Sequence, residues 1–258
     1  MSNESFTKKQ LTLVSFYGSK TDELHKLINS CIQRIQQSPL GELFRPYDIN
    51  QIHGTIIGME KVNKAHTFYN HNIETETKNN VTMDFSHFLP TVHQNFPMTI
   101  QFGGFHPSFK EFTSAGESPN TRTFQIQWIN KKVTLLGWPS ISGGVTNQLS
   151  NIRTSFLENC NISHKYKNDN DLFMVLGEIS HPNNVSISEK LQLTLDTEQL
   201  EKSIRDYLYK HPIITALDLN SLSIAQYTNP TLPITHTINH PLNKPGITAD
   251  CIRTLYSS

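Results

Sequence analysis

A histidine and a threonine stand one residue apart in a short apolar run, Ile52-His53-Gly54-Thr55-Ile56. In a β-strand successive side chains alternate between two faces, so His53 and Thr55 would point the same way. An imidazole can transfer protons near neutral pH, and a hydroxyl can donate a hydrogen bond to an anionic oxygen. Such a pair suits a phosphate diester. The alternative is a structural histidine on a half-buried strand.

Five further residues could contact such a ligand. The cluster His164-Lys165-Tyr166 offers an imidazole, an ammonium and a phenol just before a predicted strand. Arg122 follows a loop rich in Gly, Ser and Thr and could hold a phosphate through two parallel hydrogen bonds. Ser114 lies in that loop, whose hydroxyls and backbone N–H groups could bind an anion. Solvated loop residues, a surface ion pair and a plain turn are the respective alternatives.

The apolar pattern predicts the elements that must position these side chains. The clearest is a helix over 21–38, which Thr21 caps and Pro39 ends. Further helices are expected over 83–92, 146–160 and 197–209. Strands are expected over 11–17, 52–58, 98–105, 124–128, 133–138, 172–179, 191–195 and 219–227.

The composition narrows the class of protein. The chain has 258 residues, enough for one large domain or two small lobes. Lys plus Arg and Asp plus Glu number 22 each, so no overall basic charge indicates a nucleic acid. No apolar stretch reaches the roughly 18 residues that span a bilayer, and the N-terminal residues do not resemble a signal peptide. The widely spaced Cys31, Cys160 and Cys251 favour free thiols in a reducing compartment. We therefore expect a cytoplasmic protein without membrane or metal partners.

The order of elements repeats once along the chain. A helix followed by a strand occurs as 21–38 then 52–58, and again as 146–160 then 172–179. This predicts an α+β fold with two pseudo-symmetric α/β lobes, whose antiparallel sheets surround a central cleft. Residues 1–235 would form this bilobal domain, and residues 236–258 would be a tail that wraps the surface or is disordered.

With that layout the chain resembles the 2H phosphoesterase superfamily, which includes the LigT-like RNA phosphodiesterases and the 2′-5′ RNA ligase-like proteins. The segment 53–56 matches the first H-x-[ST]-x motif of the family. Residues 100–105, 122–124 and 135–138 resemble its glycine-rich strand and the hairpin that follows. Residues 172–177 lie where the second motif belongs.

The resemblance implies that two strands each present one H-x-[ST] to a shared groove. One histidine would be the base, the other would protonate the departing oxygen, and the hydroxyls would hold phosphate, with no cofactor. In the second motif, however, Phe173 replaces histidine and Val175 replaces threonine. Loss of a positioned acid or base typically lowers the rate by about 10²- to 10⁴-fold. His164, just upstream, is the candidate substitute.

These observations lead to two related hypotheses and one unrelated one. The first is a 2H-like phosphodiesterase acting on a cyclic nucleotide, a 2′,3′-cyclic phosphate or a short oligonucleotide. Its catalytic residues would be His53, Thr55 and His164, and its substrate contacts Arg122, Lys165, Tyr166, Ser114 and Phe173. The second is a degenerate 2H-fold protein that binds a nucleotide or RNA end without turnover. The third is an unrelated α+β interaction module in which His53 is incidental.

Overall fold

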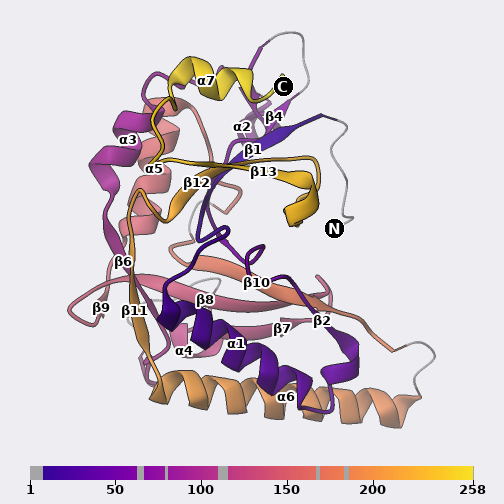
Figure 1. Ribbon diagram of the computed structural model, residues 1–258. Coiled ribbons are helices and arrows are strands. Elements are labelled where there is room, and N and C mark those ends of the chain that lie inside the picture. Colours follow the sequence, from indigo (N-terminus) through magenta and orange to yellow (C-terminus); the bar gives the residue numbers. More distant parts are fainter. Residues whose placement is uncertain are drawn as a thin grey trace.

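The computed structural model describes residues 8–62, 67–78, 81–109, 116–166, 169–182 and 186–257 (Figure 1). The α-helices are α1 (Asp22–Gln36), α2 (His71–Thr77), α3 (Phe88–Asn95), α4 (Pro119–Arg122), α5 (Gln148–Cys160), α6 (Ile187–Lys210) and α7 (Ala249–Thr254). The strands are β1 (Gln10–Ser15), β2 (Phe44–Pro46), β3 (Gly54–Gly58), β4 (Lys61–Val62), β5 (Tyr69–Asn70), β6 (Met98–Phe102), β7 (Phe124–Gln127), β8 (Lys132–Ile141), β9 (Gly144–Val145), β10 (Leu172–Ile179), β11 (Ile213–Leu217), β12 (Leu222–Tyr227) and β13 (Thr237–Pro241).

The main sheet is antiparallel at each of its strand pairs and runs in the order β11-β6-β8-β10-β3-β1-β12-β13. We call β3, β1, β12 and β13 the terminal half, because both ends of the chain supply it. We call β10, β8, β6 and β11 the central half. The two halves meet where β3 pairs with β10, with Gly54 opposite Met174. The mixed α/β class with mostly antiparallel strands is thus confirmed, whereas the two pseudo-symmetric lobes around a cleft stay a prediction.

The helix α1 forms as its sequence predicts. Thr21 accepts a hydrogen bond from the backbone N–H of Leu24, and Asp22 and Glu23 occupy the first turn, where the helix dipole favours acids. Its apolar stripe is buried in the main core, to which α3, α5, α6 and α7 also contribute. In Figure 1, α1 and α6 lie together below β7 and β8, and α3 and α5 lie side by side at the left.

Two helices, α1 and α5, each contact a strand in the half of the sheet to which their own chain segment does not belong. In the chain, α1 lies between β1 and β3 of the terminal half, with the short β2 after it, yet it contacts β11 in the central half. In the chain, α5 lies between β8 and β10 of the central half, with the short β9 before it, yet it contacts β3 as well as β8. Each half is therefore packed partly by a helix that belongs to the chain segment of the other.

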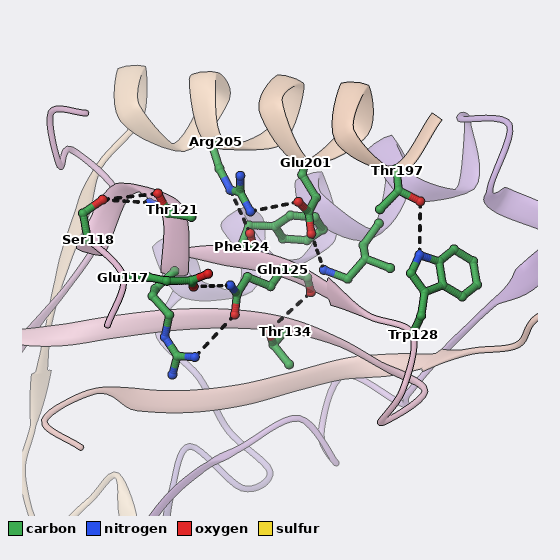
Figure 2. A network of polar contacts seen from close by, with 12 residues as sticks. Glu117, Ser118, Thr121, Phe124, Gln125, Trp128, Thr134, Thr197, Glu201 and Arg205 are labelled. Atoms are coloured by element: carbon green, nitrogen blue, oxygen red, sulfur yellow. Dashed lines mark hydrogen bonds and ion pairs between the residues drawn. The ribbon is translucent and has the colours of Figure 1, made fainter. Parts of the chain in front are cut away.

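A polar network attaches α6 to the hairpin strand β7 (Figure 2). Glu201 accepts a hydrogen bond from the backbone N–H of Ile126 at 2.7 Å and forms an ion pair with Arg205 at 2.9 Å. Arg205 in turn donates to the carbonyl of Phe124, and the Trp128 indole donates to Thr197 at 3.1 Å. These contacts satisfy polar groups of an outer strand that would otherwise need water.

One expectation from the sequence is wrong. Residues 191–195 lie inside α6 and not in a strand, because a capping box between Ser186 and Glu189 begins the helix upstream. The segment after residue 235 is ordered where the structure describes it. Residues 237–241 form β13, paired with β12, while Ile252, Leu255 and Tyr256 belong to the main core. In the described part of the chain, no helix has both the length and the apolar character needed to cross a membrane.

Candidate functional site

His53 and Thr55 share one face of the sheet, as predicted. Ile52 and Gly54 are buried, whereas His53 and Thr55 are partly exposed, which is the alternation expected of an extended chain. His53 directly precedes β3, and Thr55 lies within it opposite Val14 of β1. We call the side of the sheet that carries these two residues the site face.

The register between β3 and β10 decides what faces this pair. Directly opposite residues in an antiparallel ladder point to the same side, so the pairing of Gly54 with Met174 puts their neighbours on the other side. The register thus brings Phe173 beside Thr55 and Val175 beside His53 on the site face. Phe173 also packs against a small apolar cluster of Phe105, Leu136 and Trp138. Two apolar side chains therefore stand beside Thr55 and His53 on the site face.

Close packing and one buried cation hold this junction together. A Cβ on Gly54 would lie 2.5 Å from Cδ1 of Leu172, so glycine permits the approach of β3 and β10. Arg153, from α5, donates to the carbonyl oxygens of Thr55 and Ile56 at 3.3 and 3.1 Å. It also donates to the carbonyls of Asp169 and Asp171 ahead of β10. Burial lowers the pKa of Arg153 to about 10, so it stays charged at neutral pH.

The hydrogen bonds of His53 define its chemistry. Its Nδ1 lies 2.6 Å from the carbonyl oxygen of Gln51, which can only accept, so Nδ1 carries the proton and Nε2 keeps a lone pair. Burial lowers its pKa to about 4, and the Lys20 and Lys132 ammonium groups act in the same direction. The Tyr17 ring stands edge-on to the imidazole at 5.8 Å. His53 is therefore neutral at pH 7, with the lone pair of Nε2 free of a proton.

Two lysines act electrostatically on this imidazole, one from each half of the sheet. Lys20 follows β1, and its Nζ donates to the carbonyl oxygens of Phe16 at 2.8 Å and Gly18 at 3.2 Å. Burial lowers the pKa of Lys20 to about 8, while the Asp48 carboxylate acts to raise it. Lys132 begins β8 opposite Glu178 of β10. Burial also lowers the pKa of Lys132.

No sequence motif marks these lysines. Lys20 follows a short loop after β1, and the sequence assigns Lys132 only to the turn of a hairpin. Their proximity to His53 follows from strand order, which pairs β3 with β1 on one side and with β10 on the other.

Arg122 has a different role from the one predicted. It ends the short helix α4, is buried, and forms an ion pair with the buried Asp171, with Nη2 and Oδ2 at 3.0 Å. A second, longer contact of 3.5 Å joins it to Gln125. This guanidinium is already paired with a carboxylate inside the protein, so its role is structural. We therefore leave Arg122 out of the candidate site.

The predicted cluster at 164–166 lies near Arg153. The His164 ring has Tyr166 as its neighbour at 6.3 Å, whereas the ring neighbour of His53 is Tyr17. Burial and the Arg153 guanidinium hold the pKa of His164 well below its ordinary value. Lys165 places its ammonium 5.4 Å from the centre of the exposed Tyr166 ring. Ser114 lies outside the described residues.

Away from the site face, two other kinds of feature among the described residues could mark a site, namely metal-binding clusters and surface hollows. Within the ranges that the structure describes, no three His, Cys, Asp or Glu side chains gather as a metal site would require. Two surface hollows lie away from His53. One of about 490 Å³ is bounded by α1 and α6 around Arg34 and Tyr207, and one of about 210 Å³ lies beside Trp128 and His181. The chemistry-bearing side chains and the hollows thus occupy different places.

Comparison with known proteins gives little further information. No family model matches the chain, and neither does any curated protein. Among solved structures, a conserved protein of unknown function from Agrobacterium tumefaciens is similar, with a TM-score of 0.47 and 10% identity over 94% of this chain and 90% of that chain. At that level no function passes from one protein to the other.

Proposed function

We propose that this protein is a 2H-like phosphodiesterase that acts on a cyclic nucleotide, a 2′,3′-cyclic phosphate or a short oligonucleotide. One observation carries the proposal. His53 is neutral, has Nδ1 fixed by a carbonyl and Nε2 unprotonated, and shares the site face with Thr55. That is the state a general base needs before it accepts a proton from an attacking hydroxyl.

The surrounding groups support binding of a phosphate. The Thr55 hydroxyl can donate to a non-bridging oxygen, and the Lys20 and Lys132 ammonium groups, which act electrostatically on the imidazole, offer positive charge. His53 Nε2 takes the proton of a water or of a ribose hydroxyl as that oxygen attacks phosphorus. The reacting phosphate then lies above the β3–β10 junction.

The topology is compatible with a 2H-like arrangement. Apart from the short strands β2 and β9, the segments from β1 to β3 and from β8 to β10 each run strand, helix, strand, and the first and last strands of each segment pair antiparallel. Their final strands, β3 and β10, are neighbours. Two pseudo-symmetric lobes that share a groove at this line belong to the proposal.

A degenerate binding protein is the second candidate, and Phe173 favours it. The register that brings Phe173 and Val175 beside Thr55 and His53 leaves no imidazole at the second position. On this alternative the same face captures a nucleotide or RNA end without turnover. His164, the candidate substitute, has Tyr166 as its ring neighbour, and the Arg153 guanidinium acts together with burial to lower its pKa.

Activity and binding assays on one panel separate the two candidates. The panel contains cyclic nucleotides, 2′,3′-cyclic nucleotides, cyclic dinucleotides and 2′–5′ oligomers. Turnover by the wild type that falls by about 10²-fold or more in His53→Ala supports the enzyme. His93→Ala, at an exposed position of α3, is the matched control and should keep wild-type activity.

Two other outcomes are decisive. Thermal stabilisation by a panel member without turnover, lost in His53→Ala, supports the binding protein. If no panel member is either cleaved or bound, both candidates are wrong.

A further inference from the structure

We propose that Lys20 is the second proton carrier of this site and protonates the oxygen that leaves phosphorus, while His53 is the base. This inference rests on the proposed function, since it assigns a role in the same reaction. It addresses the missing half of the chemistry, because Phe173 and Val175 cannot supply a proton.

The chain that carries Lys20 lies against the segment that carries His53. β1 ends at Ser15, opposite Gly54, and the backbone N–H of Gly18 donates to the carbonyl of Asn50 at 2.7 Å. Tyr17, in the same loop, brings its ring against the His53 imidazole. The loop therefore follows the chain that leads into His53.

The head group of Lys20 is fixed within this loop. Two of the three N–H donors of its ammonium are taken by the carbonyls of Phe16 and Gly18, which flank Tyr17. The third donor is left for another acceptor. Phe16 has a φ of 59°, in the left-handed region that non-glycine residues rarely adopt. Such conformations persist only where the surrounding structure enforces them, and they concentrate at functional sites.

The protonation states are opposite, as an acid–base pair requires. Burial lowers the pKa of His53 to about 4 and that of Lys20 to about 8, so at neutral pH only Lys20 carries its acidic proton. Asp48 is the carboxylate that faces Lys20, and Lys132 is the other cation that acts on His53. Lys132 lies opposite Glu178, whose carboxylate opposes the lowering of the Lys132 pKa by burial and by Lys165.

The proposed step balances for a 2′,3′-cyclic phosphate. A water molecule attacks phosphorus and its proton passes to His53 Nε2. The bond from phosphorus to one ribose oxygen breaks, and Lys20 Nζ gives a proton to that oxygen. The products are a nucleoside monophosphate, an imidazolium and a neutral amine. Exchange of protons with solvent restores both side chains.

The test compares two substrates that differ in their need for an acid. A 2′,3′-cyclic nucleotide releases an alkoxide, which must be protonated, whereas bis(p-nitrophenyl) phosphate releases a stable phenolate. Lys20→Arg keeps the charge but cannot give up a proton near pH 8. We expect it to lower kcat by about 10²- to 10⁴-fold on the cyclic nucleotide and by less than about tenfold on the nitrophenyl ester. Lys26→Arg, at an exposed position of α1, should change neither rate.

The pH profile is the second measurement. Wild-type kcat on the cyclic nucleotide should fall as the pH rises above about 8, and this fall should disappear in Lys20→Arg. Lys20→Gln should also lose the alkaline fall, and because it removes the charge it should lower the nitrophenyl ester rate more than Lys20→Arg does. A variant that merely misfolds loses both rates together, and circular dichroism identifies it.

The outcomes separate this inference from the proposed function. If Lys20→Arg keeps the cyclic nucleotide rate and the alkaline fall, Lys20 is not the acid and the phosphodiesterase proposal stands. Equal losses on both substrates in a folded Lys20→Arg variant also overturn it, since they indicate electrostatic support alone. If the wild type binds the cyclic nucleotide without cleaving either substrate, both the enzyme and the acid proposals are wrong, and the binding protein remains.

Discussion

The imidazole of His53 is neutral because of where the chain places it. A carbonyl fixes its Nδ1, and burial, with a smaller contribution from two ammonium groups, disfavours a positive charge on the ring. These surroundings decide which half of an acid–base reaction the residue can perform. They also make its titration a direct test of the site.

We expect the His53 imidazole to titrate near pH 4 in the folded protein. An ordinary histidine titrates near about 6.5, because no burial opposes its charge. The ¹H–¹³C NMR shifts of the histidine rings, followed between pH 3 and 8, measure this difference. The signal missing in His53→Gln assigns the resonance. A midpoint near 6.5 would contradict the described environment.

The same lowered pKa predicts a pH dependence of stability. The unfolded chain binds the His53 proton near pH 6.5 and the folded chain near pH 4, so the free energy of unfolding decreases as the pH falls between these values. Urea unfolding at pH 7 and pH 5 should show a smaller decrease in His53→Gln than in the wild type. An equal decrease in both proteins would show that His53 contributes nothing to the pH dependence of stability.

Local patterns predicted some residues correctly and others wrongly for one physical reason. The shared face of His53 and Thr55 depends only on neighbouring backbone geometry, which the sequence encodes directly. The roles of Arg122 and Lys20 depend on partners that the fold brings in. Asp171 is 49 residues from Arg122 in the sequence. The loop that carries Lys20 is brought to the segment of His53 only by the pairing of β1 with β3. No spacing in the sequence records such contacts.

At the scale of elements, the junction of β3 and β10 depends on a missing side chain. Gly54→Ala would put a methyl group within 2.5 Å of the buried Leu172 side chain. We expect overpacking of this kind to lower the free energy of unfolding by about 1–3 kcal/mol. It should also weaken ligand binding on the site face, because the register there orients His53.

Gly144→Ala is the matched control for that variant. A Cβ at Gly144 would have the carbonyl oxygen of Ile141 as its nearest neighbour at 3.6 Å, an ordinary contact. Chemical denaturation of both variants measures the difference. Equal stability of Gly54→Ala and Gly144→Ala would mean that the Leu172 side chain or the two strands can shift to accommodate the methyl group without loss of stability.

The attachment of α6 to β7 is a second feature of this scale. Glu201→Ala leaves the backbone N–H of Ile126 without its acceptor and removes the ion pair with Arg205. Leaving a part-buried donor unsatisfied should cost about 1–3 kcal/mol. Glu198→Ala, at an exposed position of the same helix, should cost much less. Urea midpoints compare the two, and similar midpoints would contradict the role given to Glu201.

The start of α6 shows why an element can be misassigned. Leu191, Leu193 and Leu195 alternate with polar residues, which is the period of a strand. In the helix, Leu191 and Leu195 are largely exposed. The alternating leucines therefore do not form the buried face of a strand, which is what the pattern predicts. The Ser186 and Glu189 pair was the better signal, since a capping box acts through local hydrogen bonds.

At the scale of the whole molecule, the end of the chain completes the core. The Tyr256 hydroxyl donates to the carbonyl of Met59, and its ring contacts Phe68 and Phe85. Tyr256→Phe keeps the ring and removes the hydrogen bond, so we expect a loss of about 1–3 kcal/mol. Tyr209→Phe, at a 41% exposed tyrosine of α6, should leave stability unchanged. Thermal unfolding measures both, and an equally stable Tyr256→Phe would argue against this anchor.

The pairing of β1 with β12 also sets the order of folding during synthesis. Gln10 is opposite Tyr227, and all of the central half lies between them in the chain. Contacts of such long sequence separation form late, because a large loop must close first. A ribosome-bound chain that ends at residue 217 has not yet made β12, so β1 keeps one edge unpaired and should be cut rapidly by protease. Resistance should appear only once β12 and β13 have emerged, so we expect β1 to gain its second neighbour only after the whole central half has been synthesised.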